Sequence, residues 1–342
     1  MQTNKNPIYK TILTLSGLII IFAGLKVADK IIIPFFLSMF ISLISFPLLT
    51  FFKSKNINNP ASVTLVLITI MTVSLSIAAL IGTSLNSFRK SLPDYKEKIY
   101  GEIDKVLILA EKYDINISSE ILYDYVDPTF IMQSVANTIS AFGNVLTNYF
   151  LILFIVMFTL LEAAGFSNKL KMAFNNTDQS IATFHRFSEN MNKYLTIKTF
   201  ISMITGLLVY ISLSLINLDH AIMWGLIAFF LNYIPNIGSI IASIPAIIIA
   251  LIQLNFYYAL LVALIYLVIN VVMGSIIEPR YLGKELGLST LIIFLSLVFW
   301  GWLLGPVGML LSVPLTMVVK IWLESNDDSK WIAVMLGSSV NK

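Results

Sequence analysis

Long apolar runs without an ionisable side chain dominate the chain, and short charged stretches separate them. A helix needs about 20 residues to cross a hydrocarbon core of about 30 Å, because each residue adds about 1.5 Å. Runs of that length predict one membrane-spanning helix each, and they cover residues 31–52, 61–88, 128–161 and 199–218. A further apolar stretch over residues 11–25 has no small-residue cleavage site after it, which predicts a retained signal-anchor helix.

Two apolar runs in the last third, residues 221–277 and 286–319, are too long to be one upright helix each. Proline removes a backbone donor and clashes with the preceding turn, so helices that contain it must break or kink. The interrupting residues are Pro235, Gly238 and Pro245 in the first run, and Gly301, Gly305, Pro306, Gly308 and Pro314 in the second. The pattern predicts an all-α integral membrane protein of about eight transmembrane helices, with broken hairpins, either re-entrant or spanning, in the C-terminal third.

Two polar stretches interrupt the membrane pattern. Residues 89–127 carry many charges of both signs, yet apolar residues recur among them at helical spacing, which predicts an amphipathic helix outside the bilayer. Residues 168–198 similarly predict an interfacial helix that leads into the next span. The expected organisation is therefore transmembrane helices over residues 1–88, a helical extramembrane insertion over residues 89–127, and a transmembrane core with broken helices over residues 128–342.

The composition indicates a protein covered by lipid. Hydrophobic residues make up 57% of the 342 residues and charged residues only 12%, whereas a soluble domain carries roughly 25% charged residues. The net charge of +3 is too small and too dispersed to indicate nucleic-acid binding. The chain has no cysteine, and it lacks the sequence motifs of phosphate-binding loops, zinc proteases and serine hydrolases. Neither an enzyme nor a bound cofactor or metal is expected.

Lysine and arginine in the short loops predict the orientation. With a cytoplasmic N-terminus, the outer short loops would hold only Lys26 and Lys30. The cytoplasmic loops would hold most of the others, among them Lys53, Lys55, Lys169, Lys198 and Arg280. Because positive residues concentrate on the cytoplasmic side, both termini are expected in the cytoplasm.

Two segments of the last third resemble each other. Residues 237–245 read IGSIIASIP and residues 307–314 read VGMLLSVP, one residue shorter. Each pairs a glycine with a later Ser-x-Pro, which contains Ser243 in the first segment and Ser312 in the second. Corresponding interrupted segments indicate a transporter binding site, because a broken helix leaves backbone groups that lipid cannot satisfy. Kinked helices packed through small residues are the alternative reading.

Few ionisable residues lie near the apolar runs. Glu278 is the carboxylate best suited to ion or proton coupling, with Glu162 as the second candidate. Since the residue before a proline is disfavoured in the α region, Pro279 is expected to end the helix at Glu278 and to leave Arg280 as its partner. The pair could be a coupling site or only an interfacial contact.

Three asparagines, Asn232, Asn236 and Asn270, lie in otherwise apolar sequence. Their amides could coordinate a cation, bind a sugar-like hydroxyl, or bridge two helices.

Four motifs stand out in the last third: NYIPNIG at residues 232–238, IEPRYLGKELGL at residues 277–288, GPVG at residues 305–308 and VPL at residues 313–315. Together they resemble the signature of the autoinducer-2 exporter family. The chain departs from the family pattern at Asn236, at Ser239, and at Ser289 with Thr290. The resemblance implies a bacterial inner-membrane secondary transporter without a cofactor, and a homo-oligomer for which a pentamer is one candidate. It implies either autoinducer-2 export or exchange of sodium or lithium for protons.

Three functions therefore remain open. The first is a secondary transporter that exports a small polar solute. The second is a cation/proton antiporter, which needs a titrating carboxylate such as Glu278. The third is a membrane scaffold without transport, with residues 89–127 as its partner-binding surface.

Overall fold

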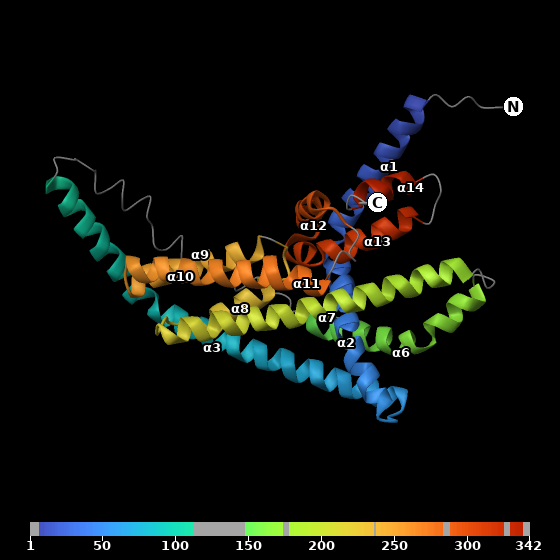
Figure 1. Cartoon of the computed structure of the whole chain (residues 1–342), viewed down its shortest axis with the longest axis horizontal. Coiled ribbons are helices and arrows are strands. Elements are labelled where there is room, and N and C mark those ends of the chain that lie inside the picture. Colours follow the sequence, from blue (N-terminus) through green and yellow to red (C-terminus); the bar gives the residue numbers. More distant parts are fainter. Residues whose placement is uncertain are drawn as a thin grey trace. The chain divides into compact units, whose positions relative to one another are not determined.

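A computed structural model describes residues 7–112, 148–173, 178–235, 237–282, 288–324 and 329–337. The regular structure of these residues is entirely helical (Figure 1). The elements are α1 (Pro7–Val27), α2 (Asp29–Ser54), α3 (Asn59–Lys112), α6 (Tyr149–Ala173), α7 (Asp178–Leu215), α8 (Ala221–Leu231), α9 (Gly238–Gln253), α10 (Phe256–Asn270), the π-helix η2 (Val271–Ile277), α11 (Glu278–Leu282), α12 (Thr290–Leu310), α13 (Ser312–Glu324) and α14 (Lys330–Leu336).

Five helical segments within the described residues are long and apolar enough to cross a membrane, namely Asp29–Ser54, Asn59–Phe88, Ser188–Leu215, Phe256–Tyr281 and Thr290–Leu310. Shorter apolar helices cover Ile12–Val27, Tyr149–Ala163, Ala221–Leu231 and Gly238–Gln253. The prediction of an all-α membrane protein is confirmed. Most of the span expected over residues 128–161 lies outside the described residues.

α3 runs without a break from its apolar half into the first polar stretch, as far as Lys112. No helix boundary falls at residue 88, although the composition changes there. Tyr95, one of the residues that recur at helical spacing in this polar stretch, is buried. The remainder of the predicted insertion, residues 113–127, lies outside the described residues.

The chain divides into two compact units. The first comprises Met1–Val63, Phe150–Leu195 and Lys284–Lys342, and the second comprises Thr64–Tyr149 and Thr196–Gly283. Each unit contains one of the two interrupted segments that the sequence predicts.

In the second unit, α8 and α9 form a hairpin whose two ends lie together, called here the first hairpin. α8 has 11 residues and α9 has 16, roughly 16 and 24 Å of helix, so neither crosses a core of about 30 Å. At the end of α9, the Gln253 side chain accepts a hydrogen bond from the Asp219 amide at 2.7 Å and donates one to the Asn217 carbonyl at 3.0 Å. Both of these residues lie in the short loop before α8. The first hairpin therefore enters and leaves on the same side, as a re-entrant segment does.

The turn of the first hairpin lies where glycine and proline predict a break. α8 ends at Leu231, and α9 begins at Gly238. At Gly238 a Cβ atom would lie 1.7 Å from the Leu231 carbonyl oxygen, far inside van der Waals contact. Since that oxygen belongs to the backbone and cannot rotate away, only glycine fits this turn. The predicted break is confirmed.

In the first unit, the second hairpin runs from α12 into α13, and its reversal lies inside α12. Gly305 has φ 65° and ψ −150°, a conformation that glycine alone adopts readily, and the chain reverses there. After the reversal, a Cβ atom at Gly308 would lie 1.9 Å from the Trp300 carbonyl oxygen. The Trp300 indole then donates a hydrogen bond to the Thr316 hydroxyl of α13 at 2.9 Å.

The two hairpins share one construction. Gly238 and Gly308 occupy matching positions in the similar sequence segments. Each lies against a backbone carbonyl oxygen from before its turn, in α8 for Gly238 and in the part of α12 before Gly305 for Gly308. The Ser-x-Pro that follows each glycine lies in the returning helix, within α9 and at the start of α13. The sequence resemblance between the two segments thus corresponds to a shared backbone feature.

The helix end predicted at Glu278 is wrong. α10 continues through η2 into α11, so the helical segment passes Glu278 and Pro279 and ends at Leu282. Glu278 keeps helical angles, and its N–H bonds to the Met273 carbonyl five residues back, as in a π-helix. In a regular α-helix, the proline ring would clash with the carbonyl four residues earlier. The wider π-turn before Pro279 relieves that clash and lets the helix continue.

Candidate functional site

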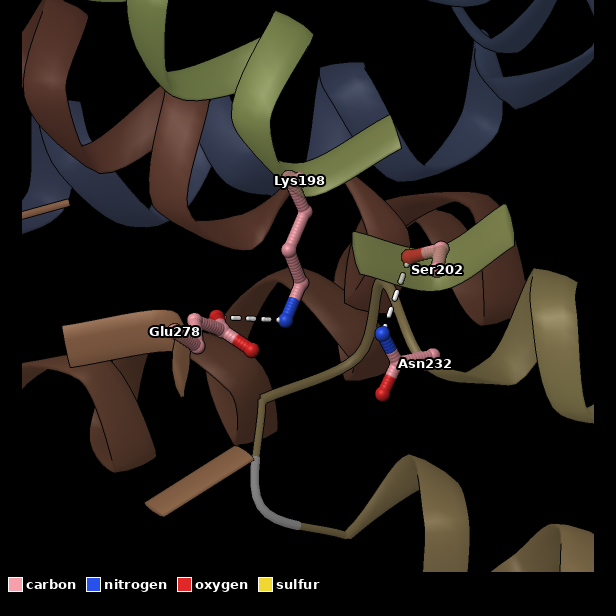
Figure 2. A network of polar contacts seen from close by, with 4 residues as sticks. All are labelled: Lys198, Ser202, Asn232 and Glu278. Carbon is pink, nitrogen blue, oxygen red and sulfur yellow. Dashed lines mark hydrogen bonds and ion pairs between the residues drawn. The ribbon is translucent and has the colours of Figure 1, made fainter. Parts of the chain in front are cut away.

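A buried ion pair joins α7 to the end of the α10–η2–α11 segment. The Lys198 ammonium lies 2.6 Å from Oε1 of Glu278 (Figure 2). Only 4% of the lysine side chain and 18% of the glutamate side chain are exposed. A buried charge is costly unless it is paired, so loss of either partner should destabilise the fold.

The turn of the first hairpin bonds to the same part of α7. The Asn232 amide nitrogen donates to the Ser202 hydroxyl at 2.9 Å, and the Tyr233 hydroxyl donates to Thr199 at 2.7 Å. Figure 2 shows Ser202 and Lys198 on α7 with Asn232 and Glu278 opposite them. The resulting group of Lys198, Thr199, Ser202, Asn232, Tyr233 and Glu278 is called here the polar cluster.

Close helix packing places the hairpin at this depth. A Cβ atom at Gly206 of α7 would lie 2.7 Å from the Gly225 carbonyl oxygen of α8, and one at Gly225 would lie 2.8 Å from the Gly206 carbonyl oxygen. The two backbones can approach this closely only because both residues are glycine. The contact lies one turn beyond Ser202 on α7, and it brings the end of α8 against the polar face of that helix.

Thr205 adds an unsatisfied hydroxyl to this face. The residue is buried, and its Oγ1 has no hydrogen-bond partner within the described residues. A buried polar atom without a partner is rare in native proteins and commonly indicates a water, an ion or a ligand. Lys198, Ser202 and Thr205 recur at the spacing of one helix face. The cluster thus offers a cation, a carboxylate, an amide and hydroxyls, which together can bind a small polar solute.

Comparison with known proteins decides the family. The model of the AI-2E family transporters matches residues 15–326. The chain belongs to this family. It is 41% identical to the AI-2 transport protein TqsA of Escherichia coli over 333 residues, which are 97% of this chain and 96% of that protein.

Two further relatives have names that describe transport without stating a solute. One, from Haemophilus influenzae, is 39% identical over 98% of both chains. The other, YhhT of Escherichia coli, is 34% identical over 95% of this chain and 93% of the relative. The resemblance drawn from the sequence motifs is confirmed, and the protein is an AI-2E family transporter. Its family and relatives are transport proteins rather than enzymes.

Within this AI-2E transporter, the predicted site residues of the second unit have different positions. Asn232 and Glu278 belong to the polar cluster, and Pro235 and Gly238 form the turn beside it. Asn236 lies outside the described residues. The pairing of Glu278 with Arg280 is wrong, because Lys198 is the partner of Glu278, and both Pro279 and Arg280 are exposed.

The other predicted residues contact their own helices. Ser243 donates to the Ile240 carbonyl, within the same helix as Pro245. The Asn270 amide oxygen lies 3.2 Å from the position of a Cβ at Gly274, one turn along the same segment. In the first unit, Gly305, Gly308, Ser312 and Pro314 belong to the second hairpin, where the Ser312 hydroxyl is buried without a partner in the described part of the chain.

Lys198, Thr199 and Ser202 were not predicted as site residues. The charge pattern assigns Lys198 to a cytoplasmic loop, whereas the structure places it within the continuous helix α7, inside the span Ser188–Leu215. The assignment of Lys198 to a loop is therefore wrong, because the residue lies within a helix. A signal was present, because Lys198, Ser202 and Thr205 follow each other at i, i+4 and i+7, the spacing of one helical face.

A second group of polar contacts holds the base of the first hairpin. The Tyr95 hydroxyl of α3 donates to the Asp219 carboxylate at 2.7 Å, and the Trp224 indole donates to the Asp219 carbonyl at 2.9 Å. Burial, followed by the bond to Asp219, raises the pKa of Tyr95 well above its ordinary value of about 10. The phenol therefore remains a donor at any physiological pH, and the polar half of α3 is tied to the hairpin base.

His220 makes this base sensitive to acid. Burial lowers the pKa of His220, and the nearby Asp219 only partly opposes that shift. Its Nε2 is buried without a partner in the described residues, and its ring contacts Phe88 at 5.6 Å between centroids. As the pH falls below about 6.5, His220 gains a proton in the unfolded chain before it does so in the folded protein. The neutral form contributes stability above that pH, and the contribution is lost as the pH falls toward the lowered folded pKa.

A His220→Asn variant should therefore lose less stability on acidification than the wild type. Asparagine tolerates the left-handed backbone of this position, where φ is 60°, and it does not titrate. The measurement is the thermal midpoint of the purified protein at pH 7.5 and at pH 5.5. Equal losses for both proteins between these pH values would show that folding does not lower the pKa of His220.

Proposed function

We propose that this AI-2E transporter is a secondary transporter that exports a small polar solute of the autoinducer-2 kind and binds it at the polar cluster. The observation that carries the proposal is the buried Lys198–Glu278 pair beside the turn of a re-entrant hairpin. The solute class is taken from TqsA, which is named for AI-2 transport and is similar along nearly the whole chain.

The hairpin supports this proposal through its depth. α8 extends roughly 16 Å from the hairpin base, about half of a hydrocarbon core, so its turn lies far from both surfaces. Backbone without regular hydrogen bonds is tolerated at such depth only where protein, water or a solute satisfies it. At this turn the N–H groups of Asn232, Tyr233 and Ile234 bond to carbonyls of α8. The side chains of Asn232 and Tyr233 bond to α7, so the cluster lies beside a break in the helices.

Sodium/proton exchange is the alternative that the same residues allow. A cation that binds Glu278 would first have to displace the Lys198 ammonium, which already neutralises the carboxylate at 2.6 Å. This contact favours a polar solute over a metal cation. The family match also favours transport over a scaffold without transport.

A flux assay in reconstituted vesicles tests the proposal. Autoinducer-2 is loaded inside, and its release is compared with that from empty vesicles, without any nucleotide. A sodium gradient with an internal pH-sensitive dye forms the second arm. Release of autoinducer-2 without a sodium-dependent pH change is expected, whereas a pH change without release would replace the proposal with the antiporter.

We further propose an orientation in the bacterial inner membrane. The multi-pass chain would have both termini in the cytoplasm and would assemble as a homo-oligomer, with a pentamer as one candidate. The positive-inside bias supports the orientation. The bond from Tyr95 to Asp219 supports one part of it, since the polar half of α3 and the hairpin base must lie on the same side.

Cysteine labelling tests this orientation. Glu97 is exposed on the polar half of α3, and Lys53 lies at the end of α2. A Glu97→Cys variant should react with an impermeant thiol reagent in intact spheroplasts, whereas Lys53→Cys should react only after lysis. The chain has no other cysteine that could react. The reverse pattern would invert the topology.

A further inference from the structure

The charge balance of the polar cluster suggests what the site excludes. A buried carboxylate must be neutralised by a proton, by a metal cation or by a positive side chain. At Glu278 the structure supplies a positive side chain, because the ammonium of Lys198 bonds to Oε1. The lysine side chain is itself almost wholly buried. We propose that Lys198 is a built-in counter-cation, which keeps the cluster neutral and keeps sodium and other monovalent metal cations away from Glu278.

The surroundings of Glu278 explain why this role is needed. Carboxylate, hydroxyl and amide oxygens are the ligands that hard cations prefer, and Glu278, Ser202 and Asn232 provide all three types around the hairpin turn (Figure 2). Without a positive side chain, such a group of oxygens would attract a cation. With Lys198 in place, a second positive charge would enter a poorly solvated site and be repelled.

The expected consequence is selectivity for charge. An uncharged polar solute can hydrogen-bond to the cluster and leave the ion pair intact, whereas a metal cation must break that pair. Lys198 is therefore a specificity-determining residue, and its meaning for transport rests on the proposed function. Charge compensation at Glu278 itself does not depend on transport, so it can be measured separately.

Removal of Lys198 should create a cation site. In the full-length Lys198→Ala protein, Glu278 has lost its partner and the truncated side chain leaves space beside it. Sodium chloride, compared with choline chloride at equal ionic strength, should raise the thermal midpoint by about 3 °C once sodium exceeds its Kd roughly tenfold. The measurement is made at pH 6 and pH 8, because protons compete for the same carboxylate. The wild-type protein should show no such rise.

The double variant Lys198→Ala with Glu278→Gln is the matched control, because it has the same space and no carboxylate. It should not respond to sodium. If Lys198→Ala does not fold, Lys198→Gln, which is neutral and keeps a polar side chain, replaces it with the same expectation.

Two results would overturn the proposal. The first is that sodium raises the thermal midpoint of Lys198→Ala no more than that of the double variant, at both pH values. The second is that sodium raises the thermal midpoint of the wild-type protein and that this rise disappears in Glu278→Gln. The second result would show that a cation displaces Lys198. Neither result depends on which solute is transported, so the proposed function stands or falls separately in the flux assay.

Discussion

A single methyl group at Gly238 is expected to abolish the first hairpin and with it most of the folded protein. In Gly238→Ala the new Cβ would lie 1.7 Å from the Leu231 carbonyl oxygen, and neither atom can move without moving backbone. Overpacking against flexible side chains costs about 1–3 kcal/mol, so a contact with fixed backbone should cost about 3 kcal/mol or more. The measurement is the yield of monodisperse protein after purification, together with its thermal midpoint.

The second hairpin provides an independent repeat of this experiment, and α3 provides its control. Gly308→Ala should have a similar effect, because its Cβ would lie 1.9 Å from the Trp300 carbonyl oxygen. Gly82→Ala, where a Cβ has no neighbour within 4 Å, should be neutral or slightly stabilising, since alanine favours helix by roughly 1 kcal/mol over glycine. Normal yield and stability of either hairpin variant would show that its turn is looser than described.

Removal of one charge of the buried pair should destabilise the protein far more than removal of both. Lys198→Met leaves Glu278 buried without a counter-charge, and Glu278→Gln leaves Lys198 in the same state. Breaking a buried pair in this way typically costs about 3–5 kcal/mol, whereas replacing both partners by neutral groups is often close to neutral. The double variant should therefore be more stable than either single variant.

A double-mutant cycle on the thermal midpoints measures this effect. Lys169 with Glu162 is the matched control, because it is an ion pair whose partners are both largely exposed. Exposed pairs contribute about 0–1 kcal/mol, so its single variants should resemble the wild type. Additive losses at Lys198 and Glu278 would contradict the description of a buried and mutually dependent pair.

The backbone features of the fold were more predictable than the contacts. Steric rules act locally, so Pro235 and Gly238 predict the break of the first hairpin without knowledge of its surroundings. The same rules failed at Pro279, because η2 accommodates the proline by widening one turn of the helix. A π-turn depends on the packing of the whole segment, and the sequence alone does not show it.

The polar cluster was less predictable, because its bonds join residues that lie far apart in the sequence. Lys198 and Glu278 are separated by 80 positions, and Ser202 and Asn232 by 30. The scarcity of polar side chains in and beside an apolar run identified Glu278 and Asn232. It could not identify Lys198, which borders a charged stretch and there resembles an interfacial lysine.

Solute flux through a variant of Asn232 tests the central claim most directly, because Asn232 connects the hairpin turn to α7 without being part of the ion pair. Asn232→Ala removes the bond to Ser202 and one solute-facing amide, while Glu278 and Lys198 stay paired. Thr72→Ala on the exposed surface of α3 is the control, since that hydroxyl bonds only to its own helix. With equal amounts of protein in the vesicles, Asn232→Ala should release autoinducer-2 about tenfold more slowly than the wild type, a factor that corresponds to roughly one good hydrogen bond. Thr72→Ala should release it at the wild-type rate. Wild-type release by a well-folded Asn232→Ala protein would contradict a solute site at the turn of the first hairpin.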